Sequence, residues 1–256
     1  MEFWPPIIGA EGHRLTMPRR KFIFLVLIMA GASMITAGCI GGDPNAIASR
    51  KIADALPDVI GPAKHYDVSV DGNAMSLSRG HASRVQIDGQ DVQVSPSLVM
   101  NTLHVDAHDM ALDTKTRKVE HAGSVEFNAA IGQLNLDRYL ASSKSTLSGL
   151  TVKIRWTDLE ASVPVSAVGI SATVVVDGTL APSSVGADKL DFIPEGADVG
   201  VVPIPHKLLE IAMNRINPVV DLSGMKFPVT VESAGAQNGR LMVVGSTTLG
   251  QKPTTN

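Results

Sequence analysis

The chain has 256 residues, one cysteine, a formal charge of -3, 44% hydrophobic residues and only 4% aromatic residues. This length allows one large domain or two modest ones, and the apolar content excludes a wholly disordered chain. The mild negative charge argues against nucleic acid as a partner, because affinity for phosphate backbones depends on clustered lysine and arginine. A single cysteine excludes a disulfide framework and multi-thiolate metal sites, and we expect no metal and no cofactor.

An export signal is predicted in residues 17–38. Arg19, Arg20 and Lys21 form a cationic start, and the apolar run 22–29 and a group of small residues follow. These are the three parts of a secretory signal. The end of the segment, at Cys39, is similar to a bacterial lipobox, in which the cysteine receives a lipid and becomes the first mature residue. We therefore expect a lipoprotein of the bacterial cell envelope, anchored to a membrane through Cys39.

Two alternatives to lipidation stay open for this segment. Residues 22–42 carry no charge and are long enough for a permanent membrane helix, and secretion without a lipid is the other alternative. Lipidation, a permanent membrane helix and secretion without a lipid would each place the domain outside the cytoplasm. Residues 1–16 are expected to be an N-terminal extension outside the signal. A linker (residues 39–43), one domain (44–250) and a flexible tail (251–256) complete the expected organisation.

The domain is expected to begin with an amphipathic helix. Asp43 and Pro44 have the residue types typical of an N-cap and the first helical position. Pro57 predicts that the regular helix ends near Leu56 or kinks there. We expect the apolar stripe to pack on a sheet rather than to contact a ligand; it comprises Ala48, Ile52, Ala55, Leu56 and Val59.

From residue 64 to 192 the hydrophobic pattern has a period of two, which predicts sheet surfaces with one apolar and one polar face. The pattern changes phase across Gly89 and across Asp109, where we expect β-bulges that bend long antiparallel strands. Two further helices are predicted, at residues 135–140 and 204–216. A closing hairpin is predicted from residues 227–232 and 240–249.

The predicted helices are too few to cover such a sheet. About 25 helical residues cannot seal the apolar face of seven or more long strands unless the sheet curls on itself. A curled sheet would leave an apolar groove, and its aliphatic walls would suit acyl chains; a fully packed sandwich is the alternative. From the phase of the strands and of the last helix, the candidate lipid-binding residues are Val125, Phe127, Ile170, Ala172, Val174, Leu208, Ile211, Ala212 and Met213.

Several stretches resemble the LmeA-like phospholipid-binding family of bacterial envelopes. Residues 78–87 (SRGHASRVQI) and 90–94 (QDVQV) look like its opening, 135–140 (NLDRYL) is similar to its central helix, and 204–218 with 226–245 resembles its ending. The resemblance covers roughly residues 45–250. It implies an α+β, TULIP/BPI-like fold, in which a long, curved antiparallel sheet wraps around one or two helices beside an apolar groove. It also implies phospholipid binding without an established catalytic residue.

Four cations are candidates for contact with a lipid phosphate. Arg79 and Arg84 are the candidate headgroup residues, and Lys153 and Arg155 are two further basic positions; ordinary surface charge is the alternative for all four. The chain departs from the family at His81, where members often have a second arginine.

No catalytic motif is found in the sequence. Nucleophile elbows and glycine-rich phosphate loops are absent. His104 and His108 flank Asp106 on one strand but would lie about 13 Å apart, which is too far for one metal ion. We expect a non-enzymatic, lipid-anchored protein that shelters the acyl chains of phospholipids. The alternatives are an envelope scaffold that binds protein partners and, third, a hydrolase with an unrecognised site. The oligomeric state stays open.

Overall fold

The computed structural model describes residues 43–113, 118–142, 149–167, 170–196, 198–199, 202–203 and 206–247. The predicted extension, signal, lipidation site Cys39 and tail therefore lie outside the described residues. Within these ranges, no helix has both the length and the apolar character needed to cross a bilayer.

The elements follow one another in an order dominated by strands. The four helices of the described residues are α1 (Pro44–Val59), α2 (Ala74–Ser78), α3 (Gln133–Ser142) and α4 (His206–Ile216). The strands are β1 (His65–Asp71), β2 (His81–Gln93), β3 (Val99–Asp113), β4 (Lys118–His121), β5 (Ser124–Gly132), β6 (Thr151–Ile154), β7 (Leu159–Ala167), β8 (Ile170–Ser183), β9 (Gly186–Gly196), β10 (Asp198–Val199), β11 (Val202–Pro203), β12 (Val220–Asp221), β13 (Thr230–Gln237) and β14 (Arg240–Ser246).

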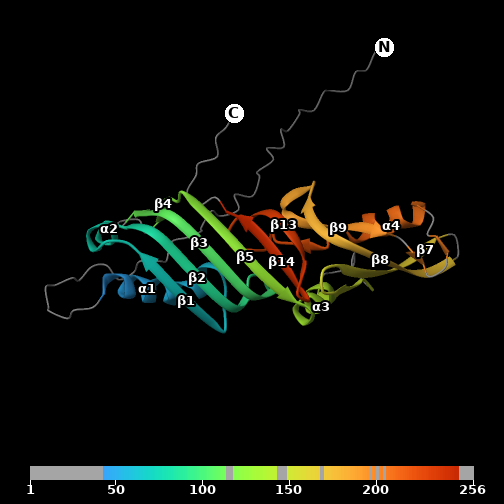
Figure 1. Cartoon of the computed structure of the whole chain (residues 1–256), viewed down its shortest axis with the longest axis horizontal. Coiled ribbons are helices and arrows are strands. Elements are labelled where there is room, and N and C mark those ends of the chain that lie inside the picture. The colour runs from blue at the N-terminus through green and yellow to red at the C-terminus, as the bar shows by residue number, and fades with distance from the viewer. Residues whose placement is uncertain are drawn as a thin grey trace, which may run out of the picture.

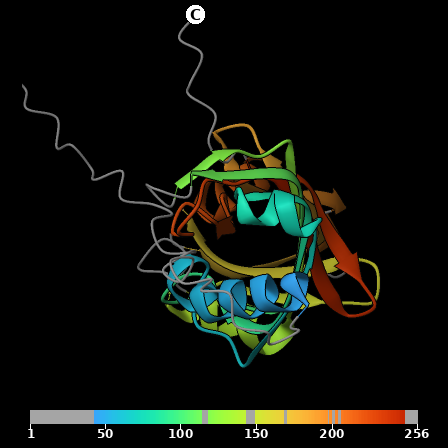
Figure 2. The same cartoon turned by 90° about the vertical axis from the view of Figure 1, so that its left-hand side faces the viewer.

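Two large antiparallel sheets, A and B, and a small two-stranded sheet of β10 and β11 form an elongated molecule (Figure 1). Sheet A has the order β1-β2-β3-β5-β14-β13, with β4 paired to β3, and sheet B has the order β12-β9-β8-β7-β6. Strand β13 at the edge of sheet A contacts β8 and β9 of sheet B. Sheet A is strongly curled, and α1 lies across its open side (Figure 2). The predicted α+β fold with a long, curved antiparallel sheet is confirmed.

In β3 the inward-facing pattern changes phase at Asp109, as predicted, whereas in β2 it changes at Asp91, two residues after the predicted Gly89, and the mechanism in both strands differs from the predicted one. Asp91 and Asp109 adopt positive φ angles of 49° and 50°. The pairing of β2 with β3 nevertheless runs from His81–Ala111 to Gln93–Val99 without a shift in register. The prediction of bulges in this pair was therefore wrong. Instead, a single aspartate in the left-handed backbone conformation changes which side chains of the strand face inward. Aspartate adopts this conformation more readily than most residues.

Helix α1 begins as predicted and runs further than predicted. The Asp43 side chain accepts a hydrogen bond from the Asn45 backbone at 3.0 Å. The helix does not end near Leu56; it continues through Pro57 to Val59. Pro57 has no N–H to donate within the helix, and it lies in the last turn. Lys226 Nζ also donates to the carbonyl oxygens of Pro57 and Asp58, at 3.1 and 2.9 Å.

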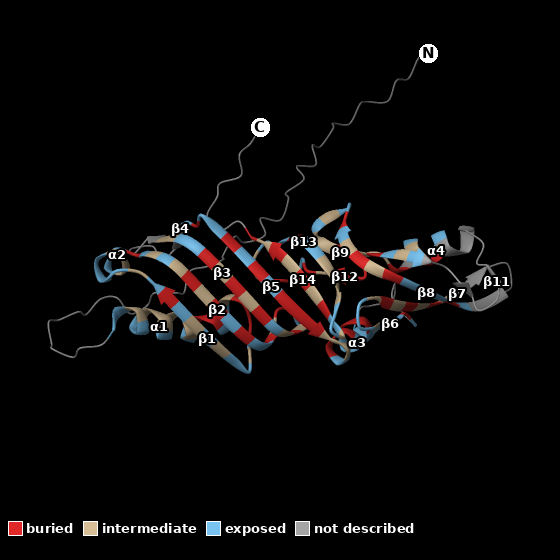
Figure 3. Ribbon diagram, viewed as in Figure 1, coloured by how far each residue is buried: buried red, intermediate tan, exposed pale blue. Residues whose placement is uncertain are grey.

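Sheet B contributes large apolar side chains to the hydrophobic core. Leu159, Leu190 and Phe192 are fully buried there, and the alternating burial of both sheets is visible in Figure 3. Side chains of α3 connect the two halves. Gln133, which follows β5 of sheet A, donates to the Val152 carbonyl and accepts from the Ile154 amide of β6, both at 2.7 Å. Gln133 therefore links the end of β5 in sheet A to the edge strand β6 of sheet B.

Candidate functional site: an apolar cavity under α1

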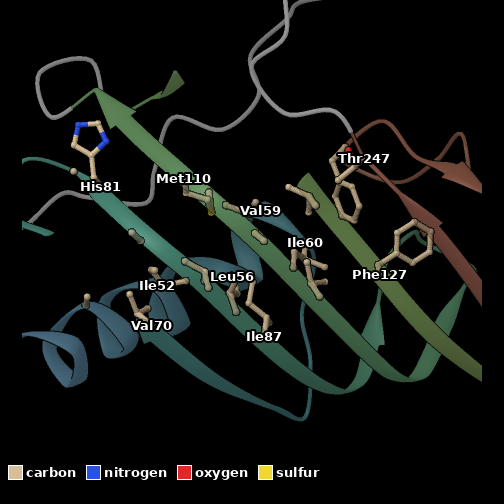
Figure 4. A pocket seen from close by; sticks show the side chains of 18 of the residues that line it. Ile52, Leu56, Val59, Ile60, Val70, His81, Ile87, Met110, Phe127 and Thr247 are labelled. Carbon is tan, nitrogen blue, oxygen red and sulfur yellow. The ribbon is translucent and has the colours of Figure 1, made fainter. Parts of the chain in front are cut away.

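A cavity of about 120 Å³ lies between α1 and the concave face of sheet A. Figure 4 shows its labelled side chains converging from the helix and from the strands. Nearly all the lining is apolar, and it comes from α1, α2, β1, β2, β3, β5 and the segments between or after these elements that contain Ile60, Gly80, Phe227 and Thr247. The lining residues are Ala48, Ile52, Leu56, Val59, Ile60, Val70, Leu77, Gly80, His81, Ala82, Val85, Ile87, Val105, Ala107, Met110, Val125, Phe127, Phe227 and Thr247.

Local sequence explains how these walls form. The stripe of α1 repeats at helical spacing, so that Ala48, Ile52, Leu56 and Val59 all face the sheet. Alternation in β3 turns Val105 and Ala107 inward. The left-handed residue Asp109 then reverses the phase, which turns Met110 inward as well. The cavity therefore extends over the bent end of the sheet.

The size and chemistry of the cavity suit hydrocarbon better than water. In another protein, an engineered apolar cavity of about 150 Å³ stays dry and binds benzene. The present cavity is of similar volume and similarly apolar. Water entering it would find few hydrogen-bonding partners, whereas a methylene chain would gain contacts on every side. The arrangement can therefore hold part of an aliphatic chain.

Two of the nine predicted lining residues belong to this cavity. Val125 and Phe127 line it from β5. The structure does not bring the other described ones here: Val174 and Ala212 are buried in the core, Met213 packs against that core, and Ile211 is 44% exposed. The side chains of Ile170, Ala172 and Leu208 lie outside the described part of the structure.

The location of the cavity differs from the prediction for a physical reason. The candidate residues in α4 placed the groove beneath that helix, but α4 contacts β7 of sheet B, whereas the cavity lies against sheet A. The cavity instead uses the stripe of α1, which we expected only to pack on the sheet. A helix face that packs in a core and a helix face that lines a cavity have the same spacing of apolar residues. The sequence pattern alone therefore did not distinguish these two roles for α1.

The two candidate headgroup arginines lie in different environments. Arg79 is the exposed C-cap residue of α2 and directly precedes Gly80 and His81 of the cavity lining. Arg84 lies on the opposite face of β2 from the lining residue Val85, and its guanidinium binds both carboxylate oxygens of Asp106. The geometry therefore gives no support to a headgroup contact by Arg84.

The ion pair between Arg84 and Asp106 should make the folding stability of the protein depend on pH in the acidic range. The hydrogen bond from Arg84 lowers the pKa of Asp106, so its stabilising effect is present above the unfolded pKa of about 4 and is lost as the pH falls through the lower folded value. We expect Asp106→Asn to lower the Tm by at most about 3 °C at pH 7, as for other partly exposed pairs. Thermal melts between pH 7 and pH 2 should show this difference shrinking below about pH 4. A difference that is constant with pH would contradict the assignment.

The other polar candidates form ordinary surface interactions. His104 Nδ1 lies 2.7 Å from Asp88, and His108 Nε2 lies 3.3 Å from Asp106. Lys153 pairs with Glu160 at 3.1 Å, and Arg155 pairs with Asp158, Glu160 and Asp177. No group of three or more possible metal ligands occurs among the described residues.

A comparison with protein families agrees with the curled sheet and the apolar cavity. The family model described as LmeA-like phospholipid-binding matches residues 45–246, which is most of the chain. The chain belongs to the LmeA-like phospholipid-binding family. No curated protein and no solved structure matches it significantly. For this member of the LmeA-like family, the cavity under α1 is the described feature that fits a lipid tail.

Proposed function

We propose that this LmeA-like protein holds phospholipid, or carries it between membranes, in a bacterial cell envelope without catalysing a reaction. The observation that carries the proposal is the apolar cavity between α1 and sheet A. An acyl chain would occupy this cavity, and lipidated Cys39 would keep the domain beside its source of lipid.

Simple burial supplies enough free energy for such binding. Each methylene removed from water contributes about 0.8 kcal/mol, so about six carbons, as in the benzene that a cavity of similar volume binds, contribute about 5 kcal/mol as an upper limit before ordering costs. The aliphatic lining therefore needs no specific chemistry to retain a tail. Headgroup recognition would depend on polar residues at the end of the cavity.

The proposal is tested by what purifies with the protein. The full chain, produced in a bacterium and detergent-purified, is extracted with organic solvent, and the extract is analysed by mass spectrometry. We expect about one phospholipid per chain and uptake of a fluorescent phospholipid by stripped protein. A chain that contains no lipid and takes up none would instead support a scaffold. Release of fatty acid from labelled phospholipid would support a hydrolase.

The anchoring part of the proposal has a separate test. Cys39→Ser removes the thiol that would receive the lipid, so we expect the protein to move from the membrane fraction to the soluble envelope fraction. Fractionation of cells followed by immunoblotting measures this change. Ser33→Ala, in the same segment, should leave the distribution as it is. Retention of the Cys39→Ser protein on the membrane would rule out this anchor.

A further inference from the structure

A second pocket, lined by both polar and apolar residues, adjoins the apolar cavity. It has a volume of about 410 Å³ and lies between α2, the start of β2, and the neighbouring parts of β3 and β4. His81, Ala82 and Met110 line both spaces, so the two share a wall and meet at one end of the cavity. The pocket lining is Gly72, Asn73, Ser76, His81, Ala82, Ser83, Asp109, Met110, Ala111 and His121.

Several polar side chains of this pocket are available to a ligand. Ser83 Oγ donates to the Asp71 carbonyl at 2.7 Å, so its hydroxyl proton is already used. The side chains of Ser76, His81, Asp109 and His121 form no hydrogen bond or ion pair with any residue that the structure describes. The pocket thus offers two imidazoles and a hydroxyl as donors, and one carboxylate as an acceptor.

The opposite end of the cavity offers no comparable group. Figure 4 places His81 at one end of the cavity and Thr247 at the other. Thr247 is buried, and its hydroxyl donates to the Pro228 carbonyl. Among the described lining residues, a lipid lying along the cavity therefore finds polar partners that are not already hydrogen-bonded only at the His81 end, where the second pocket begins.

We propose that this second pocket binds the headgroup of the phospholipid, and that Asp109 selects a headgroup with an ammonium group. The inference rests on the proposed lipid-binding function. The imidazoles of His81 and His121 and the hydroxyl of Ser76 can donate to the phosphate oxygens. The carboxylate of Asp109 repels a phosphate but accepts charge-assisted hydrogen bonds from an ammonium. Phosphatidylethanolamine offers those N–H donors, whereas phosphatidylcholine has the same charge and none.

The chain provides a closely matched pair of variants. Asp109→Asn removes the carboxylate charge and keeps a side chain that tolerates the positive φ of 50°. Asp91→Asn makes the same change at a φ of 49° elsewhere on the β2–β3 pair, outside both pockets. The change in net charge and the positive φ at the substituted residue are the same in Asp109→Asn and Asp91→Asn. A difference between them reports on the pocket.

The experiment measures displacement of a fluorescent phospholipid from the stripped full chain. The competitors are phosphatidylethanolamine, phosphatidylcholine and phosphatidylglycerol with identical acyl chains. We expect wild type and Asp91→Asn to prefer phosphatidylethanolamine over phosphatidylcholine by about tenfold, the scale of one charge-assisted hydrogen bond. Asp109→Asn should lose most of that preference while its affinity for phosphatidylcholine stays within about twofold.

A second pair of variants tests the phosphate contacts. His121→Ala should weaken binding of all three lipids by about fivefold, the scale of one hydrogen bond, whereas His65→Ala, an exposed histidine of β1 outside the pocket, should not. Equal binding of all three lipids by wild type and by both aspartate variants would overturn the headgroup site and leave the lipid cavity standing. Failure of wild type to bind any lipid would overturn the proposed function itself.

Discussion

Ala48→Trp is expected to prevent phospholipid binding while leaving the fold intact. Ala48 lies on α1, is partly exposed, and lines the apolar cavity. An indole placed there would occupy most of the volume of about 120 Å³ and would bury its own ring against the aliphatic walls. Because the ring fills space that is otherwise empty, the folded state should not lose stability. We expect at least a tenfold loss of affinity for a fluorescent phospholipid.

Ala46→Trp is the matched control for this variant. Ala46 is exposed on the same helix, two residues away, and does not line the cavity. Both variants carry the same small helix-propensity cost, so a difference between them reflects the cavity. Thermal melts followed by circular dichroism should give similar Tm values for both. Equal lipid binding by the two folded variants would show that the lipid does not bind in the cavity under α1.

The largest loss of stability is expected from Gly61→Ala, at the connection between α1 and β1. Gly61 has a φ of 153°, and a Cβ atom there would lie 2.0 Å from the Gln93 carbonyl oxygen. The connection must then move, although Tyr66 Oη donates to the Gly61 carbonyl at 2.8 Å and Gln93 N donates to the Pro62 carbonyl at 2.8 Å. Backbone strain of about 1–3 kcal/mol and two weakened hydrogen bonds of about 1 kcal/mol each should lower the free energy of unfolding by about 3–5 kcal/mol.

Urea denaturation measures this loss, with Gly235→Ala as the control. A Cβ at Gly235 would meet no atom within 4 Å, so that variant should be as stable as wild type or up to about 1 kcal/mol more stable. Tyr66 gives a local readout, because burial raises its pKa to about 12. In Gly61→Ala its ionisation should move toward the ordinary value of about 10. Equal stability of the two glycine variants would contradict the expected clash.

The sequence predicted those features that depend on local patterns. Asp43 and Pro44 indicated the start of α1, and the alternation around Val125 and Phe127 indicated an inward strand face. The turn at Asn238 and Gly239 joins β13 to β14, and both residues have positive φ. Each of these signals depends on neighbours within a few positions.

The features that the sequence did not predict depend on long-range packing. Helix α2, with Asn73 as its N-cap, is only five residues long and was not predicted. The second pocket brings His81 and His121 together from strands on either side of β3, and no spacing in the sequence indicates that meeting. Both α1 and α4 carry an apolar stripe, and it is the stripe of α1 that lines the cavity because α1 lies across the open side of the curled sheet A.

The empty cavity also carries an energetic cost for the protein itself. Unfilled apolar volume destabilises a core by about 24 cal/mol per Å³, so about 120 Å³ corresponds to roughly 3 kcal/mol. A tail that enters the cavity replaces the missing contacts and completes the hydrophobic core. A bound lipid tail would therefore act as part of the hydrophobic core, and the loaded and unloaded proteins should differ in how readily they unfold.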